Sequence, residues 1–459
     1  MPDKVKKNLK RGLGAAPLLP ALFFLFLSIF SCSNKAQLRE TRSRQLALSI
    51  DREARALAQK RSKAIDDFAL SLSESERLSQ LFVINLEGDK EFCFVEWLEE
   101  KSLGKDGTAG PRPLVPGGYI FFSFNISRSP EQIAAFTDSV RAFAREQNVV
   151  EPFLCLDAEG GYVNRLRGVA GPLPENEWVA KNLSPEQARL LYMLNAAQLK
   201  ALGFDLNLSP VVEVQNESNK EFLDGRSFGS PRQVVQYGSA ALLAYKKAGV
   251  GTVLKHFPGN NSVDPHLALP LLSYSREDFE REVLEPFGAL LKALPDGVLM
   301  SHALVSIDGK DAQGQKTPAS LSPYWIKDIL RSRLAFDGLV FSDDIFMAAL
   351  EKNSWPSERA VKAAILAGVN CILMSEKRFL NEWKIVQRLY QNDADFRAAA
   401  DDSIRRVLKF KLDAGILEWS AERNSIAPSQ NRQAAQERMA RFYGAKKLNE
   451  EALEKYGEK

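Results

Sequence analysis

Ionisable side chains recur in this sequence directly after short apolar segments. These positions are Asp157-Ala-Glu159, Lys255-His256, Ser301-His302 and Ser342-Asp343-Asp344. The chain has three histidines in all, and the third, His266, lies in the loop just after Lys255-His256. Carboxylates and imidazoles together can supply a nucleophile and a general acid/base. Arg165, Arg226 and Lys255 are then available to hold an uncharged, polyhydroxylated ligand. This set of groups is what the hydrolysis of a sugar requires.

The sequence lacks the motifs of several other kinds of active site. There is no HExxH or Cys/His metal spacing, Ser342 is not in a GxSxG turn, and Gly160-Gly161 lacks the spacing of a dinucleotide loop. We therefore expect no metal and no cofactor. The chain has 459 residues, 45% of them hydrophobic, and a net charge of +3, which is ordinary globular composition without a basic field for nucleic acid. Cys93, Cys155 and Cys371 are expected to be buried free thiols.

Eight short apolar runs, separated by amphipathic stretches, predict the elements that position these groups. The runs are 81–86, 117–122, 152–156, 204–214, 249–254, 297–300, 338–341 and 369–374. Helix starts are indicated where Ser precedes Pro, at Ser129, Ser184, Ser230 and Ser322. Eight such strand–helix units predict an α/β fold, a single-domain (β/α)8 TIM-like barrel over residues 66–418. An open doubly wound sheet is the alternative. In a barrel, the ends of the strands at which the ionisable groups lie form the active site.

The two ends of the chain differ from this pattern. Residues 1–31 combine basic Lys4, Lys6 and Arg11 with an apolar run, which predicts a signal peptide. Cys32 follows a small residue at its end and resembles a bacterial lipobox, so lipidation of Cys32 is expected; an ordinary signal peptide is the alternative. Residues 32–65 are expected to be a polar tether or helix and residues 419–459 a polar, solvent-facing helical tail.

Several motifs follow one another along the chain. They are LDAEGGYVNRLRG (156–168), SPVVEV (209–214) with DGRSFGSP (224–231), KHFPGNNSVDPHLALP (255–270) and FDGLVFSDDIFM (336–347). In this order they resemble the signatures of glycoside hydrolase family 3, and most closely those of its β-N-acetylglucosaminidase branch. The resemblance runs from about residue 70 to residue 418. It implies a catalytic barrel and a retaining mechanism through a covalent glycosyl-enzyme.

The resemblance also implies residue roles. Asp343 would be the nucleophile, His266 the general acid/base, and Asp264 the residue that orients His266. Positions that match the sugar-binding subsite are Asp157, Arg165, Arg226, Lys255 and His256, and His302 would line the pocket or serve the structure. Asp344 is expected to bind backbone and Glu159 to pair with an arginine.

Two departures from the family pattern fall near the predicted acid. The loop reads PGNN where the family has PGHG, and Pro265 separates Asp264 from His266. Proline fixes its own φ and restricts the backbone of Asp264 before it. Tyr162 stands where the family has Arg. We expect an active enzyme with an altered leaving-group preference. Because no second domain is expected, the acid should come from the barrel itself.

The predicted function is that of an exo-β-N-acetylglucosaminidase acting on peptidoglycan fragments or chitooligosaccharides. We expect a monomer in the cell envelope, held at the membrane through a lipid anchor. Three alternatives stay open at this point: a β-glycoside phosphorylase, a β-glucosidase or xylosidase of the same family, and a non-catalytic sugar-binding lipoprotein.

Overall fold

The computed structural model describes residues 44, 47, 49–93, 95–100, 110–263, 268–311, 317–346, 348–430 and 433–457. The chain divides into two units, Met1–Lys63 and Ala64–Lys459. In the first unit, residues 49–63 are helical and mostly exposed. The predicted signal peptide and Cys32 lie outside the described residues. Among the helices that are described, none has both the length and the apolar character needed to span a bilayer.

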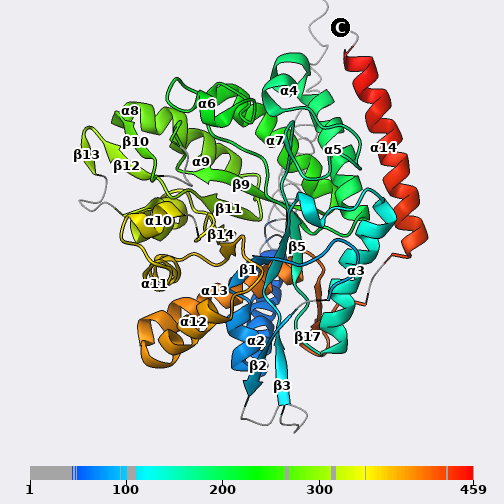
Figure 1. Ribbon diagram of the computed structural model, residues 1–459, viewed down its shortest axis with the longest axis vertical. Coiled ribbons are helices and arrows are strands. Elements are labelled where there is room, and N and C mark those ends of the chain that lie inside the picture. The colour runs from blue at the N-terminus through cyan, green and yellow to red at the C-terminus, as the bar shows by residue number, and fades with distance from the viewer. Residues whose placement is uncertain are drawn as a thin grey trace, which may run out of the picture. The chain divides into compact units, whose positions relative to one another are not determined.

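Eight parallel strands form the centre of the second unit (Figure 1). They are β1 (Phe82–Asn85), β4 (Gly118–Phe121), β5 (Phe153–Leu156), β8 (Leu206–Asn207), β9 (Gly251–Phe257), β11 (Gly297–Met300), β14 (Leu339–Phe341) and β15 (Ile372–Met374). The sheet order is β14-β11-β9-β8-β5-β4-β1-β15. A parallel bridge between Phe341 of β14 and Cys371, directly before β15, joins the two ends of this order. The sheet therefore closes into a TIM-like barrel, and the alternative of an open doubly wound sheet is wrong.

Helices surround the barrel. They are α2 (Glu74–Ser79), α3 (Pro130–Glu146), α4 (Asn176–Asn182), α5 (Pro185–Ala201), α6 (Lys220–Leu223), α7 (Pro231–Ala248), α8 (Arg276–Phe279), α9 (Glu285–Leu291), α10 (Ala348–Lys352), α11 (Ser357–Ala367), α12 (Leu380–Asn392) and α13 (Ala394–Asp413). Ser129, Ser184 and Ser230 precede α3, α5 and α7 as predicted, each with proline at the first helical position. The fourth predicted start is confirmed as well, since Pro323 is helical and the N–H of Ile326 donates to the carbonyl of Ser322 at 3.2 Å. This helix continues as η4 (Tyr324–Arg333).

Short additional strands lie in the loops after the barrel strands. They are the hairpins β2 (Glu96–Glu100) with β3 (Gly110–Leu114) and β6 (Ala158–Gly160) with β7 (Val163–Asn164), and the small sheet of β10 (Leu271–Tyr274), β12 (Leu304–Ile307) and β13 (Lys310–Asp311). The apolar runs of the sequence did not predict them, because polar residues, glycine or proline interrupt the apolar positions of these strands. Cys93 lies in the loop before β2 and is exposed, so its predicted burial is wrong.

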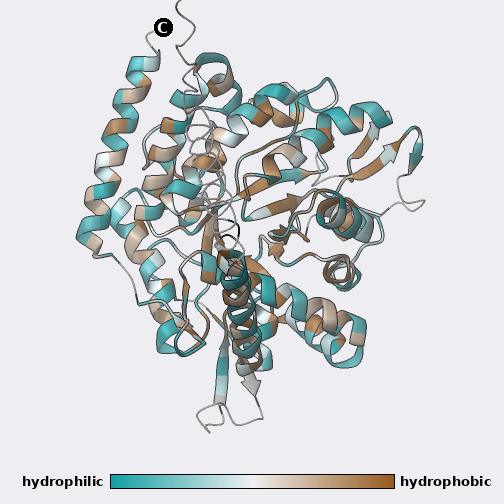
Figure 2. Cartoon of the chain, turned by 180° about the vertical axis from the view of Figure 1, so that it is seen from behind, coloured by the Kyte–Doolittle hydropathy of each residue, from teal (hydrophilic) through white to brown (hydrophobic). Residues whose placement is uncertain are grey.

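Two apolar layers hold the barrel together. Side chains from the strands fill its interior, including Phe153, Cys155 and Cys371, and both of these thiols are free and buried as expected. Phe410 of α13 packs edge-on against Phe153, with ring centroids 5.3 Å apart. The larger layer lies between the strands and the helices. Figure 2 shows brown, hydrophobic residues in the central strands and many teal, hydrophilic residues in the outer helices.

The C-terminal segment is a hairpin followed by a long helix. Strands β16 (Leu417–Ser420) and β17 (Ser425–Pro428) pair antiparallel, and α14 (Ala435–Gly457) then lies beside α5. Phe442 and Asn449 of α14 are buried, and Asn449 donates to the carbonyl of Pro172 at 2.9 Å. The prediction of a solvent-facing tail is therefore wrong, because one face of this helix packs on the barrel.

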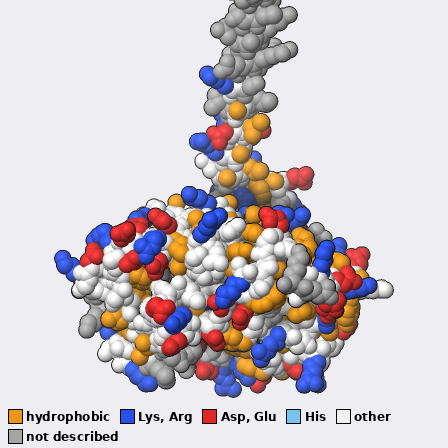
Figure 3. Space-filling view, turned by 90° about the horizontal axis from the view of Figure 1, so that it is seen from above, with side chains coloured by type: hydrophobic (Ala, Val, Ile, Leu, Met, Phe, Trp, Pro, Cys, Tyr) orange, Lys and Arg blue, Asp and Glu red, His pale blue; other side chains and the backbone are white. Residues whose placement is uncertain are grey.

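The surface of the second unit carries both signs of charge. On the face seen in Figure 3, Lys and Arg side chains are interspersed with Asp and Glu. This distribution agrees with the small net charge of the chain, +3.

One lysine, Lys411, is fully buried at the N-terminal edge of the barrel. Lys411 of α13 donates from Nζ to Oε1 of Gln80 at 2.5 Å, and burial lowers the pKa of Lys411 to about 7. An unfolded chain keeps the ordinary lysine pKa of about 10.4. Between these two values the unfolded state binds more protons than the folded state, so the stability that this group contributes rises with pH across that window.

We predict that Lys411→Met raises the free energy of unfolding at pH 7, where the buried ammonium is unfavourable. The gain should shrink by about 1 kcal/mol for each pH unit above 7, because the folded amine is then neutral while the unfolded amine keeps its proton, and the free-energy cost of removing that proton on folding falls as the pH rises. Urea unfolding of both proteins between pH 7 and pH 9 measures this difference. Lys409→Met on the exposed side of the same helix is the control and should change stability little at any pH. A Lys411→Met effect independent of pH would contradict the prediction.

Candidate active site

A buried lysine joins two carboxylates at the C-terminal edge of the barrel. Lys255 lies near the end of β9, which extends past the predicted run to Phe257. Its Nζ is 2.7 Å from Oδ1 of Asp157, just after β5, and 2.6 Å from Oε1 of Glu159 in β6. All three side chains are buried. The parallel strands thus bring together groups that are about a hundred residues apart in the sequence.

Two arginines complete this ionic cluster. Arg226 makes a bidentate pair with Glu159, at 2.8 Å from Nε and 2.9 Å from Nη2. Arg165 donates from Nη2 to Oδ2 of Asp157 at 3.0 Å. We call Asp157, Glu159, Arg165, Arg226 and Lys255 the ionic cluster. Its three cations and two carboxylates leave one positive charge in excess.

The cluster keeps both carboxylates ionised. Burial alone would raise the pKa of Asp157, but the charges of Lys255 and Arg165 outweigh it and hold that pKa well below its usual range. Lys255 and Arg226 lower the pKa of Glu159 in the same way against the effect of burial. Asp157 can therefore accept hydrogen bonds from hydroxyl groups, while the cations donate. Such an arrangement suits a neutral, polyhydroxylated ligand.

A second buried carboxylate, Glu213, holds the neighbouring histidine. Val211 pairs with Lys255 in a parallel bridge, which places Glu213 beside the end of β9. Oε1 of Glu213 is 2.6 Å from Nδ1 of His256, and its Oε2 accepts from the backbone N–H of Asn260 at 2.6 Å. The sequence motif contained Glu213, but no role was predicted for it. The available signal was an acidic residue among the three valines of residues 211–214.

Backbone hydrogen bonds fix the segment that carries Asp343. The N–H of Asp343 donates to the carbonyl of Met300 at 3.0 Å, and the N–H of Ser342 to that of Cys371 at 3.0 Å. The carboxylate of Asp344 accepts from the backbone of Phe346 at 3.1 Å and of Ser375 at 3.3 Å. As predicted, Asp344 binds backbone. Asp343 is partly exposed at the same edge of the barrel as the ionic cluster.

His302 holds the backbone of this segment through a hydrogen bond. It is fully buried, with Nε2 at 2.9 Å from the carbonyl oxygen of Asp344 and Nδ1 at 2.6 Å from Oγ of Ser320. A carbonyl oxygen only accepts, so Nε2 must carry the proton and Ser320 donates to Nδ1. Both ring nitrogens are engaged within the protein. Of the two roles expected for His302, these contacts favour the structural one.

The predicted acid/base and its orienting carboxylate, His266 and Asp264, lie outside the described residues, so their placement stays a prediction. The loop that leads to them is anchored at its start. Besides the bond from Asn260 to Glu213, the N–H of Ser262 donates to the carbonyl of Ser218 at 2.7 Å.

The sequence agrees with a known family over most of this barrel. A family model described as the glycosyl hydrolase family 3 N terminal domain matches residues 114–410. This chain belongs to glycosyl hydrolase family 3. The family assignment makes it a glycoside hydrolase.

Similar proteins agree with this assignment. A Beta-hexosaminidase of Alkalilimnicola ehrlichii is 34% identical over 267 residues, which cover 56% of this hydrolase and 73% of that protein. The structure of a β-N-acetylhexosaminidase from Beutenbergia cavernae matches with a TM-score of 0.60 and 25% identity, covering 74% of this chain and 98% of that one. A family 3 β-N-acetylglucosaminidase from a Paenibacillus species has a TM-score of 0.64 at 24% identity, over 82% and 69% of the two chains, and supports the fold.

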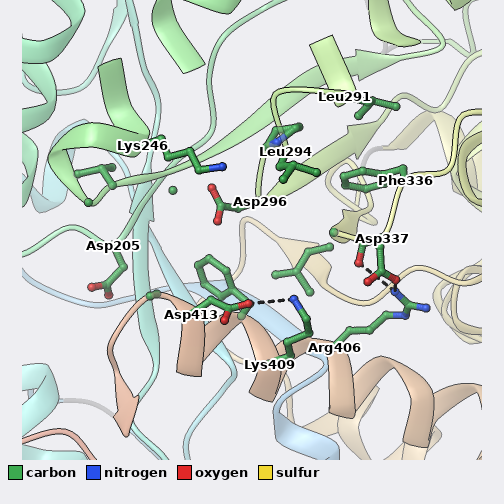
Figure 4. Close-up of a pocket in the computed structure, with 18 of the residues that line it drawn as sticks. Asp205, Lys246, Leu291, Leu294, Asp296, Phe336, Asp337, Arg406, Lys409 and Asp413 are labelled. Atoms are coloured by element: carbon green, nitrogen blue, oxygen red, sulfur yellow. Dashed lines mark hydrogen bonds and ion pairs between the residues drawn. The ribbon is translucent and has the colours of Figure 1, made fainter. Parts of the chain in front are cut away.

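A cavity of about 570 Å³ lies at the opposite edge of the hydrolase barrel, where β9, β11 and β14 begin (Figure 4). Four of its charged groups pair with one another: Lys409 with Asp413 at 2.9 Å and Arg406 with Asp337 at 2.7 Å. In this fold the N-terminal edge serves stability and the C-terminal edge serves chemistry. We therefore place the active site at the ionic cluster and not in this cavity.

We predict that Arg226→Ala lowers the free energy of unfolding by about 3 kcal/mol, because it leaves the buried Glu159 without its bidentate partner. Urea unfolding at pH 7 measures the loss. Arg281→Ala is the matched control, since Arg281 pairs with Asp278 on the exposed surface, and it should cost less than about 1 kcal/mol. Equal losses in the two variants would show that the Arg226–Glu159 pair contributes no more than a surface ion pair.

Proposed function

We propose that this hydrolase removes terminal β-linked GlcNAc from peptidoglycan fragments or chitooligosaccharides, with retention of configuration. The observation that carries the proposal is the ionic cluster at the C-terminal edge of the barrel. The segment that contains Asp343 lies at the same edge. The relatives named Beta-hexosaminidase support the choice of an N-acetylhexosamine as the substrate. Asp157 would accept hydrogen bonds from sugar hydroxyls, while Arg165, Arg226, Lys255 and His256 would bind the other polar groups of that sugar.

The proposed reaction has two displacements. In the first, the carboxylate of Asp343 attacks the anomeric carbon while the imidazolium of His266 gives its proton to the glycosidic oxygen, and the C–O bond to the leaving group breaks. In the second, His266 takes a proton from water, the water oxygen attacks the anomeric carbon, and the bond to Asp343 breaks. Asp264 would orient His266, because a carboxylate stabilises the charged imidazole. Histidine suits both steps since its pKa is near neutrality.

We predict that Asp343→Asn abolishes hydrolysis of an aryl β-GlcNAc, because the amide cannot form the glycosyl-enzyme. The release of the aryl group measures activity, and mass spectrometry of the wild type with a slow 2-fluoro or 5-fluoro substrate should find the sugar attached to Asp343. A panel of GlcNAc, GalNAc, glucose and xylose glycosides, each with and without phosphate, tests the sugar specificity and the alternative of phosphorolysis.

The neighbouring carboxylate offers a matched control. Asp344→Asn keeps an oxygen that can accept from the backbone N–H groups of Phe346 and Ser375, so it should retain activity. His266→Ala should slow substrates with poor leaving groups far more than aryl glycosides, whereas His256→Ala should mainly raise KM. Full activity of Asp343→Asn, or a wild type that binds GlcNAc without cleaving any glycoside between pH 4 and 8, would refute the proposal.

We further propose that the hydrolase is anchored in the cell envelope through a lipid on Cys32. The support is the order of basic residues, apolar run and small residue before this cysteine. Expression in a bacterium with labelled palmitate should give a labelled protein in the membrane fraction, and Cys32→Ser should abolish the label. A wild type without label, released in soluble form, would contradict the anchor and leave the enzymatic proposal intact.

A further inference from the structure

An exposed aromatic ring stands on a rigid turn at the C-terminal edge of the barrel. The turn is η1 (Ser123–Asn125), directly after β4, and its Phe124 is 58% exposed. Asn125, fully buried, fixes the turn. Its Oδ1 accepts from Nδ2 of Asn85 and from the N–H of Phe122, both at 2.9 Å, and its Nδ2 donates to the carbonyls of Leu86 and Gly88 at 2.9 and 2.8 Å.

Phe124 is connected to the ionic cluster through one neighbouring ring. The ring centroids of Phe124 and Phe122 are 6.0 Å apart, and the guanidinium of Arg165 lies 5.5 Å from the centroid of Phe122. Arg165 in turn binds Asp157. An unbroken series of contacts therefore leads from the proposed sugar-binding pocket to the exposed ring.

A cation borders Phe124 on its other side. Nζ of Lys377, in the loop after β15, is 5.3 Å from the centroid of the Phe124 ring and 3.0 Å from Oε2 of Glu87. We call Phe122, Phe124 and Lys377 the rim platform. Because Glu87 balances the charge of Lys377, the platform offers an apolar face without a net charge. An uncharged ligand with a flat C–H face fits it better than an anion.

We propose that the rim platform binds the sugar ring of the leaving group, with the C–H face of a pyranose packed on Phe124. An enzyme that removes terminal sugars encloses the terminal residue, so only the leaving-group side of the substrate extends to the rim. Because Asn125 fixes the backbone of the turn, binding at Phe124 costs little backbone freedom, which favours affinity. This inference rests on the proposed function and identifies the residues that select the leaving group.

Two substrates that differ only in the leaving group test the platform. In chitobiose the leaving group is a second GlcNAc, whereas in β-GlcNAc fluoride it is a single atom. Phe124→Ala should lower kcat/KM for chitobiose by about 10-fold, which is the typical effect of one aromatic contact. The same variant should leave kcat/KM for the fluoride within about twofold, since no ring then reaches the platform. Phe124→Trp should restore turnover of chitobiose.

Further measurements distinguish a failure of the rim platform from a failure of the proposed function. Tyr443→Ala removes another exposed ring, on α14, and should change neither substrate. Calorimetric binding of chitobiose to Asp343→Asn, with and without Phe124→Ala, measures the platform apart from turnover. A Kd unchanged by Phe124→Ala, or an equal loss on both substrates, overturns the platform. A wild type that cleaves neither substrate contradicts the proposed function alone.

Discussion

The ammonium of Lys255, buried between two carboxylates, is the interaction on which the rest of this active site depends. A buried charge without partners is strongly unfavourable, so each member of the ionic cluster requires the others. Asp157 and Glu159 come from the segment after β5, Lys255 from β9, and Arg226 from the loop before α7. These segments can satisfy one another only if the barrel has closed with its strands in the observed order.

Around the ionic cluster, buried polar side chains act mainly through hydrogen bonds to the backbone of the loops. Glu213 accepts from the N–H of Asn260 and so fixes the start of the loop that leads to His266, while His302 donates to the carbonyl of Asp344 beside the proposed nucleophile. Asn125 does the same for the turn that presents Phe124. Chemistry and specificity thus lie in loops, but each loop is tied to a strand end by a buried polar group.

The two edges of the barrel have separate tasks. The C-terminal edge gathers the charges of the ionic cluster, which we propose bind the sugar. At the other edge, Phe410 of α13 packs into the barrel, Lys411 is buried next to Gln80, and Lys409 and Arg406 of the nearby cavity pair with Asp413 and Asp337. Substitutions at that edge should change stability alone, whereas substitutions at the C-terminal edge should change binding and turnover, and also stability where a buried charge loses its partner.

The sequence by itself determined the eight strands and the four predicted helix starts, and its resemblance to the family predicted that Asp157, Arg165, Arg226 and Lys255 share one site. These features are local or repeat along the chain: a continuous apolar run buries both faces of a strand, and Ser-Pro fixes a helix start. Only the tertiary structure decided that Glu213 holds His256, that both nitrogens of His302 are engaged, and that α14 packs on the barrel. Each of these depends on which distant segment lies opposite a given side chain, and composition and periodicity do not encode that. The exposure of Cys93 follows the same rule, because burial of a single residue is set by what packs over it.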